Sequence, residues 1–94
     1  MTKGELQNRN KKFAIGVIKL VRSLPNDRVF DPLVRQVVKS STSIGANYRA
    51  ACRGKSKADF INKLKIVEEE TDETVYFLDL LNDINGKPAM DLIL

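Results

Sequence analysis

Apolar residues recur every three or four positions in three long stretches of the sequence, and this spacing restricts the fold more than any other feature. In the first stretch, Phe13, Val17, Leu20, Val21 and Leu24 fall on one face of a helix. No segment alternates apolar and polar residues with a period of two, which is the pattern of a half-buried strand. The sequence therefore predicts an all-α protein without a sheet.

Turn and capping residues divide the chain into helices. Pro25 ends the first helix, because proline cannot continue a helix interior. Asp31-Pro32 is expected to start the second, with aspartate accepting from the first free amides and proline at the first helical position, and Gly54 fits its C-terminal cap. Ser56, followed by Asp59, resembles the capping box of a third helix. The expected helices cover about residues 5–24, 32–53 and 57–83, and a stub over 89–94 resembles the opening of a fourth.

The second and third helices carry apolar seams that step by three and four residues. The middle of the second helix, residues 40–46, is rich in small, poor helix formers, so tertiary packing must hold it. Tyr48 and Tyr76 are expected in the core or an interface. We predict a single domain over residues 1–94, an antiparallel up-and-down four-helix bundle with the fourth helix largely missing. Such a bundle exposes apolar surface, which predicts self-association. The seam residues are Val34, Val37, Ser41, Ile44, Tyr48 and Ala51, then Phe60, Leu64, Val67, Thr71, Thr74, Leu78 and Leu81.

The side chains present exclude several classes of enzyme. The chain has no histidine, the commonest general base and metal ligand. Its single cysteine, Cys52, has arginines nearby but no identifiable base, so nucleophilic catalysis is not indicated. No apolar run approaches the ~20 residues of a membrane helix, and no signal peptide is visible. We expect a cytoplasmic protein without catalytic activity, metal or cofactor.

Charge is strongly segregated along the chain. Residues 6–26 contain five basic residues and no acid, and residues 32–58 contain six basic residues and no acid. Residues 66–94 contain eight acids and one lysine, so the net charge of +4 conceals two basic helices and one acidic helix. Two hypotheses follow. Either a basic surface attracts phosphate, or the basic helices pair with the acidic helix and leave little free charge.

Nucleic-acid binding is the stronger functional hypothesis. On the second helix, Lys39, Arg49 and Arg53 share one face, and Arg35 lies one turn before Lys39. Contact with phosphates rather than reading of bases is expected, because aromatic residues are scarce and lie mostly in the apolar seams. The competing hypothesis is a protein-interaction scaffold that binds no nucleic acid. The predicted phosphate-binding residues are Arg35, Lys39, Arg49, Arg53, Lys55 and Lys57.

Four blocks of the second and third helices resemble a known family. They read SIGANYR at 43–49, SKADFI at 56–61, KLKIV at 63–67 and ETDET at 70–74. Together they resemble the four-helix bundle proteins related to the 23S rRNA intervening-sequence protein. The residues that carry this resemblance, and that are expected to be structural, are Ser43, Asn47, Tyr48, Ser56, Asp59, Phe60, Glu70 and Glu73.

The resemblance implies a four-helix bundle that assembles into a homopentamer. It also implies relatedness to the accessory variability determinant of diversity-generating retroelements, a basic pentamer that engages reverse transcriptase and nucleic acid. The implied partners are further copies of the chain, RNA or DNA, and a nucleic-acid-processing protein, with no membrane. The family name records a gene's position inside rRNA insertions rather than a reaction. Ala50 stands where many members carry Glu, which makes the second helix more basic.

Overall fold

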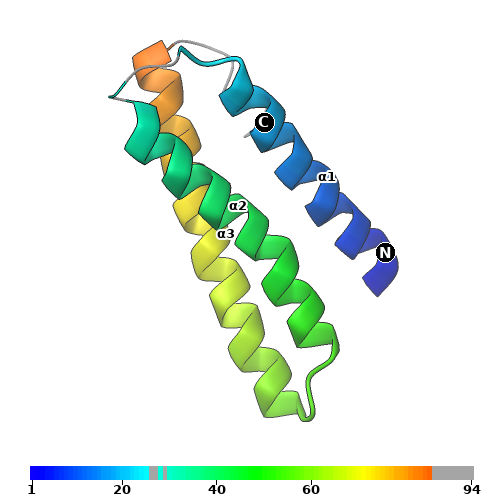
Figure 1. The fold of residues 1–94 in the computed structure, drawn as a ribbon. Helices are drawn as coiled ribbons and strands as arrows, with labels where there is room; N and C mark the ends of the chain where they lie inside the picture. The colour runs from blue at the N-terminus through cyan, green and yellow to red at the C-terminus, as the bar shows by residue number, and fades with distance from the viewer. Residues whose placement is uncertain (26–27, 29, 86–94) are drawn as a thin grey trace.

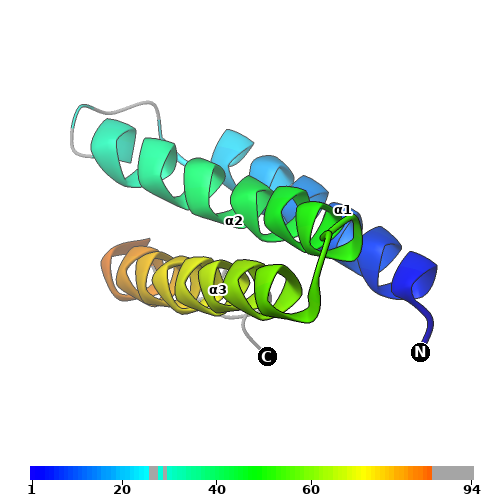
Figure 2. The same cartoon turned by 90° about the horizontal axis from the view of Figure 1, so that it is seen from below.

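The computed structural model describes residues 1–25, 28 and 30–85, and within them the chain forms three α-helices and no strand. The helices run up, down and up in an antiparallel bundle (Figure 1). Figure 2 shows α2 lying next to both other helices, which makes α2 the central element. The all-helical bundle predicted from the apolar spacing is confirmed, and the expected stub over 89–94 lies outside the described residues. The helices are α1 (Lys3–Arg22), α2 (Phe30–Cys52) and α3 (Lys57–Asn85).

The first helix begins earlier and ends earlier than its apolar spacing predicts. Thr2 is the N-cap, and its hydroxyl accepts a hydrogen bond from the Glu5 amide at 3.1 Å. At the other end, the Ser23 amide donates to the Leu20 carbonyl at 2.9 Å, a bond that tightens the last turn. The helix therefore ends at Arg22, and the expectation that it reaches Leu24 is wrong by one half-turn.

The start of α2 differs from the expectation that Asp31 caps it from outside. The helix begins at Phe30, so Asp31 and Pro32 both lie in its first turn. The amides of a first turn have no acceptor within the helix, so the missing N–H of proline breaks no bond there. Phe30 is 7% exposed and belongs to the core cluster. Its burial favours a helix that starts two residues before Pro32.

The connection between α2 and α3 follows the sequence closely. The Ser56 hydroxyl accepts a hydrogen bond from the Asp59 amide at 3.1 Å, which confirms the predicted cap. The Asp59 carboxylate accepts from the amide of Lys55 at 3.3 Å rather than from that of Ser56. The Gly54 amide donates to the Ala51 carbonyl at 2.9 Å. A Cβ on Gly54 would lie 2.9 Å from the Asp59 carboxylate and 3.0 Å from the Ala51 carbonyl oxygen, so a larger residue would force the turn to shift.

The largest core cluster lies where the end of α1, the start of α2 and the end of α3 meet. The α2 seam is confirmed, since Val37, Ile44 and Ala51 are all buried, and Ser40 and Ser41 are buried beside them. Small side chains at these positions let α3 approach α2 closely. The cluster consists of Val17, Phe30, Val37, Leu78 and Leu81.

The seam of α3 is buried over part of its length. Thr74 is fully buried, and its hydroxyl lies 2.8 Å from the hydroxyl of Ser40 on α2. Thr71 is exposed and its hydroxyl donates to its own helix, so the prediction that it lies in the seam is wrong. Tyr76 is 62% exposed and packs edge-on against Phe77, so it is not part of this chain's core. Both residues lie on sides of α3 that α2 does not cover.

Candidate nucleic-acid interface

All six predicted phosphate-binding residues are exposed. Arg35, Lys39 and Arg49 project from α2, on a different face from the buried seam that packs against α3. The remaining three follow in the turn and at the first position of α3. Because exposed cations keep their hydration and their freedom to move, they are available to a polyanion at little desolvation cost. The remaining three residues are Arg53, Lys55 and Lys57.

Within the described residues, the acidic helix makes no close ion pair with this surface, although its Asp59 lines a hollow together with Arg53 and Lys55. Among the residues that the structure describes, the single ion pair joins Lys63 and Asp59, at 3.2 Å and within α3 itself. No cation of α1 or α2 in the described ranges lies within ion-pair distance of an acid on α3. Within the described residues, α2 and α3 pack through apolar and hydroxyl side chains rather than through ion pairs.

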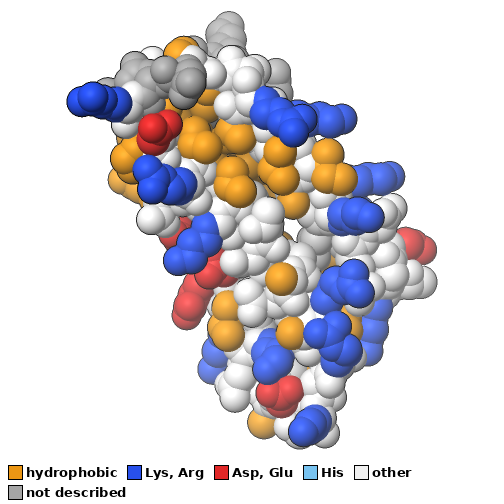
Figure 3. All heavy atoms as spheres, viewed as in Figure 1, with side chains coloured by type: hydrophobic (Ala, Val, Ile, Leu, Met, Phe, Trp, Pro, Cys, Tyr) orange, Lys and Arg blue, Asp and Glu red, His pale blue; other side chains and the backbone are white. Residues whose placement is uncertain are grey.

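The first helix extends the basic surface. Figure 3 shows lysine and arginine side chains spread over both α1 and α2 on one face of the molecule, with acidic side chains few and mostly towards its edges. Lys11, Lys12 and Lys19 of α1 are all exposed. The first helix has an acid-free stretch in the sequence, but none of its residues was predicted to bind phosphate. The packing of α1 on α2 brings these two acid-free stretches together.

A groove of about 400 Å³ lies between the N-terminal half of α1 and the C-terminal half of α2. The two helices approach closely at Gly45, where a Cβ would lie 3.5 Å from the Cβ of Asn10. Cationic, amide and small side chains alternate around the groove. The lining residues are Gly4, Gln7, Asn8, Asn10, Lys11, Ala14, Thr42, Gly45, Ala46 and Arg49.

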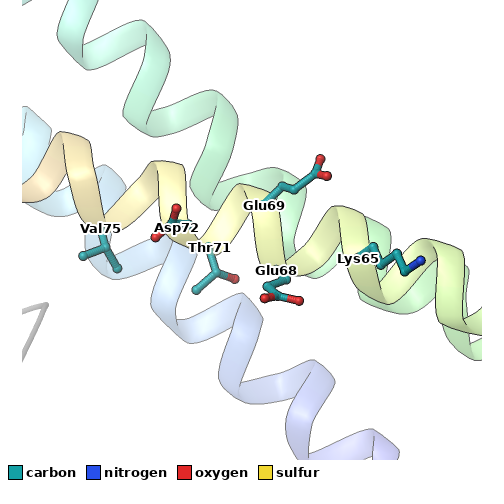
Figure 4. A pocket seen from close by; sticks show the side chains of 6 residues that line it. All are labelled: Lys65, Glu68, Glu69, Thr71, Asp72 and Val75. Carbon is teal, nitrogen blue, oxygen red and sulfur yellow. The ribbon is translucent and has the colours of Figure 1, made fainter.

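The larger hollow, about 670 Å³, lies on α3 and has the opposite character. Figure 4 shows its side chains spreading outward from one helix rather than converging on a point. Three of the six lining residues are acids, so the surface repels phosphate. Within the part of the chain that the structure describes, no three cysteine, aspartate or glutamate side chains are grouped to hold a metal ion. The lining residues are Lys65, Glu68, Glu69, Thr71, Asp72 and Val75.

The motif residues of α2 have structural surroundings. The side-chain amide of Asn47, which is half-buried, donates to the Ser43 carbonyl at 2.9 Å within its own helix. Tyr48 is 9% exposed, and its burial raises the pKa of the phenol, with the neighbouring Cys52 thiol adding to the rise. Both residues are uncharged and at least half-buried, so neither adds to the charged surface.

The motif residues of α3 divide between its cap and its sides. Ser56 and Asp59 form the cap described above, and Asp59 also pairs with Lys63. Phe60 and Glu70 are half-buried, whereas Glu73 is exposed. None of them lies among the six predicted phosphate-binding residues. The described helices are too short or too polar to span a lipid bilayer.

Comparison with known proteins agrees with this architecture. The family model of the 23S rRNA-intervening sequence protein matches residues 3–91. A crystal structure of a protein of unknown function from the S23 ribosomal protein family of Bacteroides thetaiotaomicron VPI-5482 superposes with a TM-score of 0.81. The two sequences are 31% identical, and the match covers 98% of this chain and 91% of that one. The comparison with curated proteins finds no match.

Proposed function

The chain belongs to the 23S rRNA-intervening sequence protein family, and on the basis of its exposed cationic face we propose that it is a non-enzymatic helical-bundle protein that binds the phosphate backbone of RNA or DNA. The observation that carries this proposal is that the six predicted phosphate-binding residues are exposed and that none of them makes an ion pair with an acid of the described part of α3. Exposed cations without close ion-pair partners are suited to a polyanionic partner.

The proposed mechanism is phosphate neutralisation with release of bound counterions. Each phosphate contacted contributes about 0.9 to the slope of log K against log salt on duplex DNA. Cations of α1 widen the same face and add contacts, among them Lys11, which lines a groove together with Arg49 of α2. Binding of this kind depends little on base sequence, because phosphate contacts position the protein without reading bases.

Self-association would strengthen such weak contacts. Several large apolar side chains are exposed on the described part of α3, among them Ile61, Ile66, Val75 and Ile84. Exposed apolar surface of this kind favours contact between chains. We infer an oligomer, with the homopentamer implied by the family resemblance as the expected state. Several copies of the cationic face in one particle would multiply the affinity through avidity.

The competing proposal is a scaffold that binds protein and no nucleic acid, and the same exposed apolar side chains favour it. The double variant Arg49→Gln/Arg53→Gln separates the two proposals. Nucleic-acid binding that is lost while the oligomer stays intact supports the first. Assembly that is lost, with no nucleic-acid binding in the parent protein, supports the scaffold. Light scattering after size exclusion measures the oligomer in both proteins.

The direct test is fluorescence anisotropy with labelled structured RNA and with labelled duplex DNA at several salt concentrations. We expect micromolar or tighter binding at low salt that weakens steeply as salt rises. Absence of binding to either probe at low salt would refute nucleic-acid binding by the isolated protein. Binding without salt dependence would show that phosphate contact is not its source.

A further inference from the structure

The groove between α1 and α2 differs from the rest of the cationic face in its lining, which combines side-chain amides, cations and small residues. Its volume of about 400 Å³ falls within the range of small-molecule sites, which is about 300–1,000 Å³. The phosphate proposal uses Arg49 at its edge but gives no role to its interior. The groove brings side-chain amides of α1 close to two exposed cations, Lys11 and Arg49.

Three side-chain amides, those of Gln7, Asn8 and Asn10, line the α1 side of the groove. Within the described part of the chain, no hydrogen bond engages any of these amides, whereas the Thr42 hydroxyl across the groove donates to the Val38 carbonyl at 2.7 Å. Each amide group offers both a donor and an acceptor. Such groups match the edges of nucleobases, which also combine donors and acceptors.

The floor of the groove is small and apolar. Ala14, Gly45 and Ala46 contribute methyl groups and bare backbone, and the close approach of the helices at Gly45 closes the bottom. A flat ring can lie against such a floor without displacing a side chain. Lys11 and Arg49, both exposed, stand on opposite walls, one from each helix. The groove therefore offers the ring face of a nucleobase an apolar surface and offers the edge of the base the side-chain amides. It offers the attached phosphate two cations.

We propose that this groove takes one unpaired nucleotide of a single-stranded RNA or DNA. The base lies on the floor with its edge towards the amides, and its phosphate contacts Lys11 and Arg49. The inference rests on the proposed nucleic-acid binding and adds a preference to it. A base within a duplex is stacked and paired and cannot enter, so single strands gain a contact that duplexes of the same sequence lack.

The test fills the groove without changing charge. Ala46 is exposed on α2, so Ala46→Leu extends into the groove without disturbing the core. Ala58→Leu, at an exposed position in the first turn of α3, is the matched control. The probes are an unstructured 20-nucleotide oligomer, as RNA and as DNA, and its duplex, all labelled with fluorescein. We expect Ala46→Leu to weaken single-strand binding about five- to tenfold and to leave duplex binding and the control unchanged.

A second variant keeps the proposal open to refutation if Ala46→Leu does not fold, as judged by circular dichroism. Asn8→Ala removes one exposed amide from the groove and is expected to weaken single-strand binding without affecting the duplex. Equal binding of single strand and duplex, with Ala46→Leu matching the parent on both, would overturn the groove proposal and leave phosphate binding standing. An equal loss on both probes would overturn it as well. No binding to any probe at low salt would overturn the proposed function itself.

Discussion

The buried hydroxyl pair between α2 and α3 allows a sharp test of how these helices are held together. Thr74 is fully buried, and its hydroxyl lies 2.8 Å from the Ser40 hydroxyl and 2.7 Å from the Glu70 carbonyl of its own helix. The Ser40 hydroxyl has one further acceptor nearby, the Val37 carbonyl at 3.4 Å, which is long for a hydroxyl hydrogen bond. The Ser40 hydroxyl therefore depends on Thr74 for its good hydrogen bond, whereas the Thr74 hydroxyl keeps the Glu70 carbonyl as a second partner.

Thr74→Val removes the hydroxyl and keeps the shape of the side chain. Ser40 is then left buried with a poor acceptor, so we expect a loss of about 1–2 kcal/mol in the free energy of unfolding. Ser40→Ala leaves Thr74 its good bond to Glu70, so its cost is smaller, about 0.5–1 kcal/mol. The double variant is expected to cost about 1 kcal/mol less than the sum, because no unpaired hydroxyl remains.

Urea denaturation followed by circular dichroism measures all three free energies. For a chain of this size, each kcal/mol corresponds to a shift of about 4–8 °C in Tm. Thr71→Val is the matched control, since Thr71 donates to a carbonyl of its own helix in the same way but is exposed, and its change should stay within about 0.5 kcal/mol. A Thr74→Val effect no larger than that of Thr71→Val, or a double variant equal to the sum, would refute the coupling.

Three further substitutions test other parts of the structure. Gly45→Ala is expected to raise stability by about 0.5–1 kcal/mol in thermal melts, because a Cβ there makes an ordinary contact at 3.5 Å and alanine favours a helix; no gain would mean that the helices are closer than described. Asn47→Leu is expected to change the oligomeric state, measured by size exclusion, or stability by about 1 kcal/mol, and two unchanged values would remove any role for its amide. Tyr48→Phe should flatten the alkaline loss of stability. Burial raises the pKa of Tyr48, so the folded chain keeps a proton that the unfolded chain releases above about pH 10, and the parent should lose stability there faster than the variant. Identical pH profiles would contradict this.

Much of the fold follows from the sequence because it depends on local spacing. The seam of α2 is buried as its three- and four-residue steps predict, and Ser56 caps α3 as its hydroxyl suggests. The start of α1 could also have been predicted from the sequence. Thr2 followed by Glu5 is a capping pair, and it lies before the first apolar residues of the helix face. Helix ends that depend on tertiary burial were harder to predict, and Phe30 at the start of α2 is the clearest example.

The errors on α3 have a different origin. The three- and four-residue spacing alone places Thr71 and Thr74 in the same seam of α3, yet Thr71 is exposed and Thr74 is buried. The difference depends on where α2 passes over α3, which no local pattern contains. Tyr76, which was predicted to lie in the core or an interface, is exposed in the single chain, and its place in an interface stays a prediction.

The candidate site was predictable in part. Exposure of Arg35, Lys39 and Arg49 follows from their shared face of α2, opposite the seam. Whether acids of α3 would neutralise them could not be derived, because that depends on the angle at which two charged faces meet. The groove was not predicted, since its amides on α1 and small residues on α2 are brought together by helix packing. The acid-free stretch of the first helix was the available signal.

The central claim is that the cations of α2 contact phosphates directly, and the salt dependence of the double variant Arg49→Gln/Arg53→Gln tests it most directly. Both side chains are exposed, so the variant should fold normally. We predict that the slope of log K against log salt on duplex DNA falls by about 1.8, which is two contacts at about 0.9 each. Lys65→Gln, which removes an exposed cation from α3, should leave the slope unchanged. Equal slopes for the parent and the double variant would contradict the account.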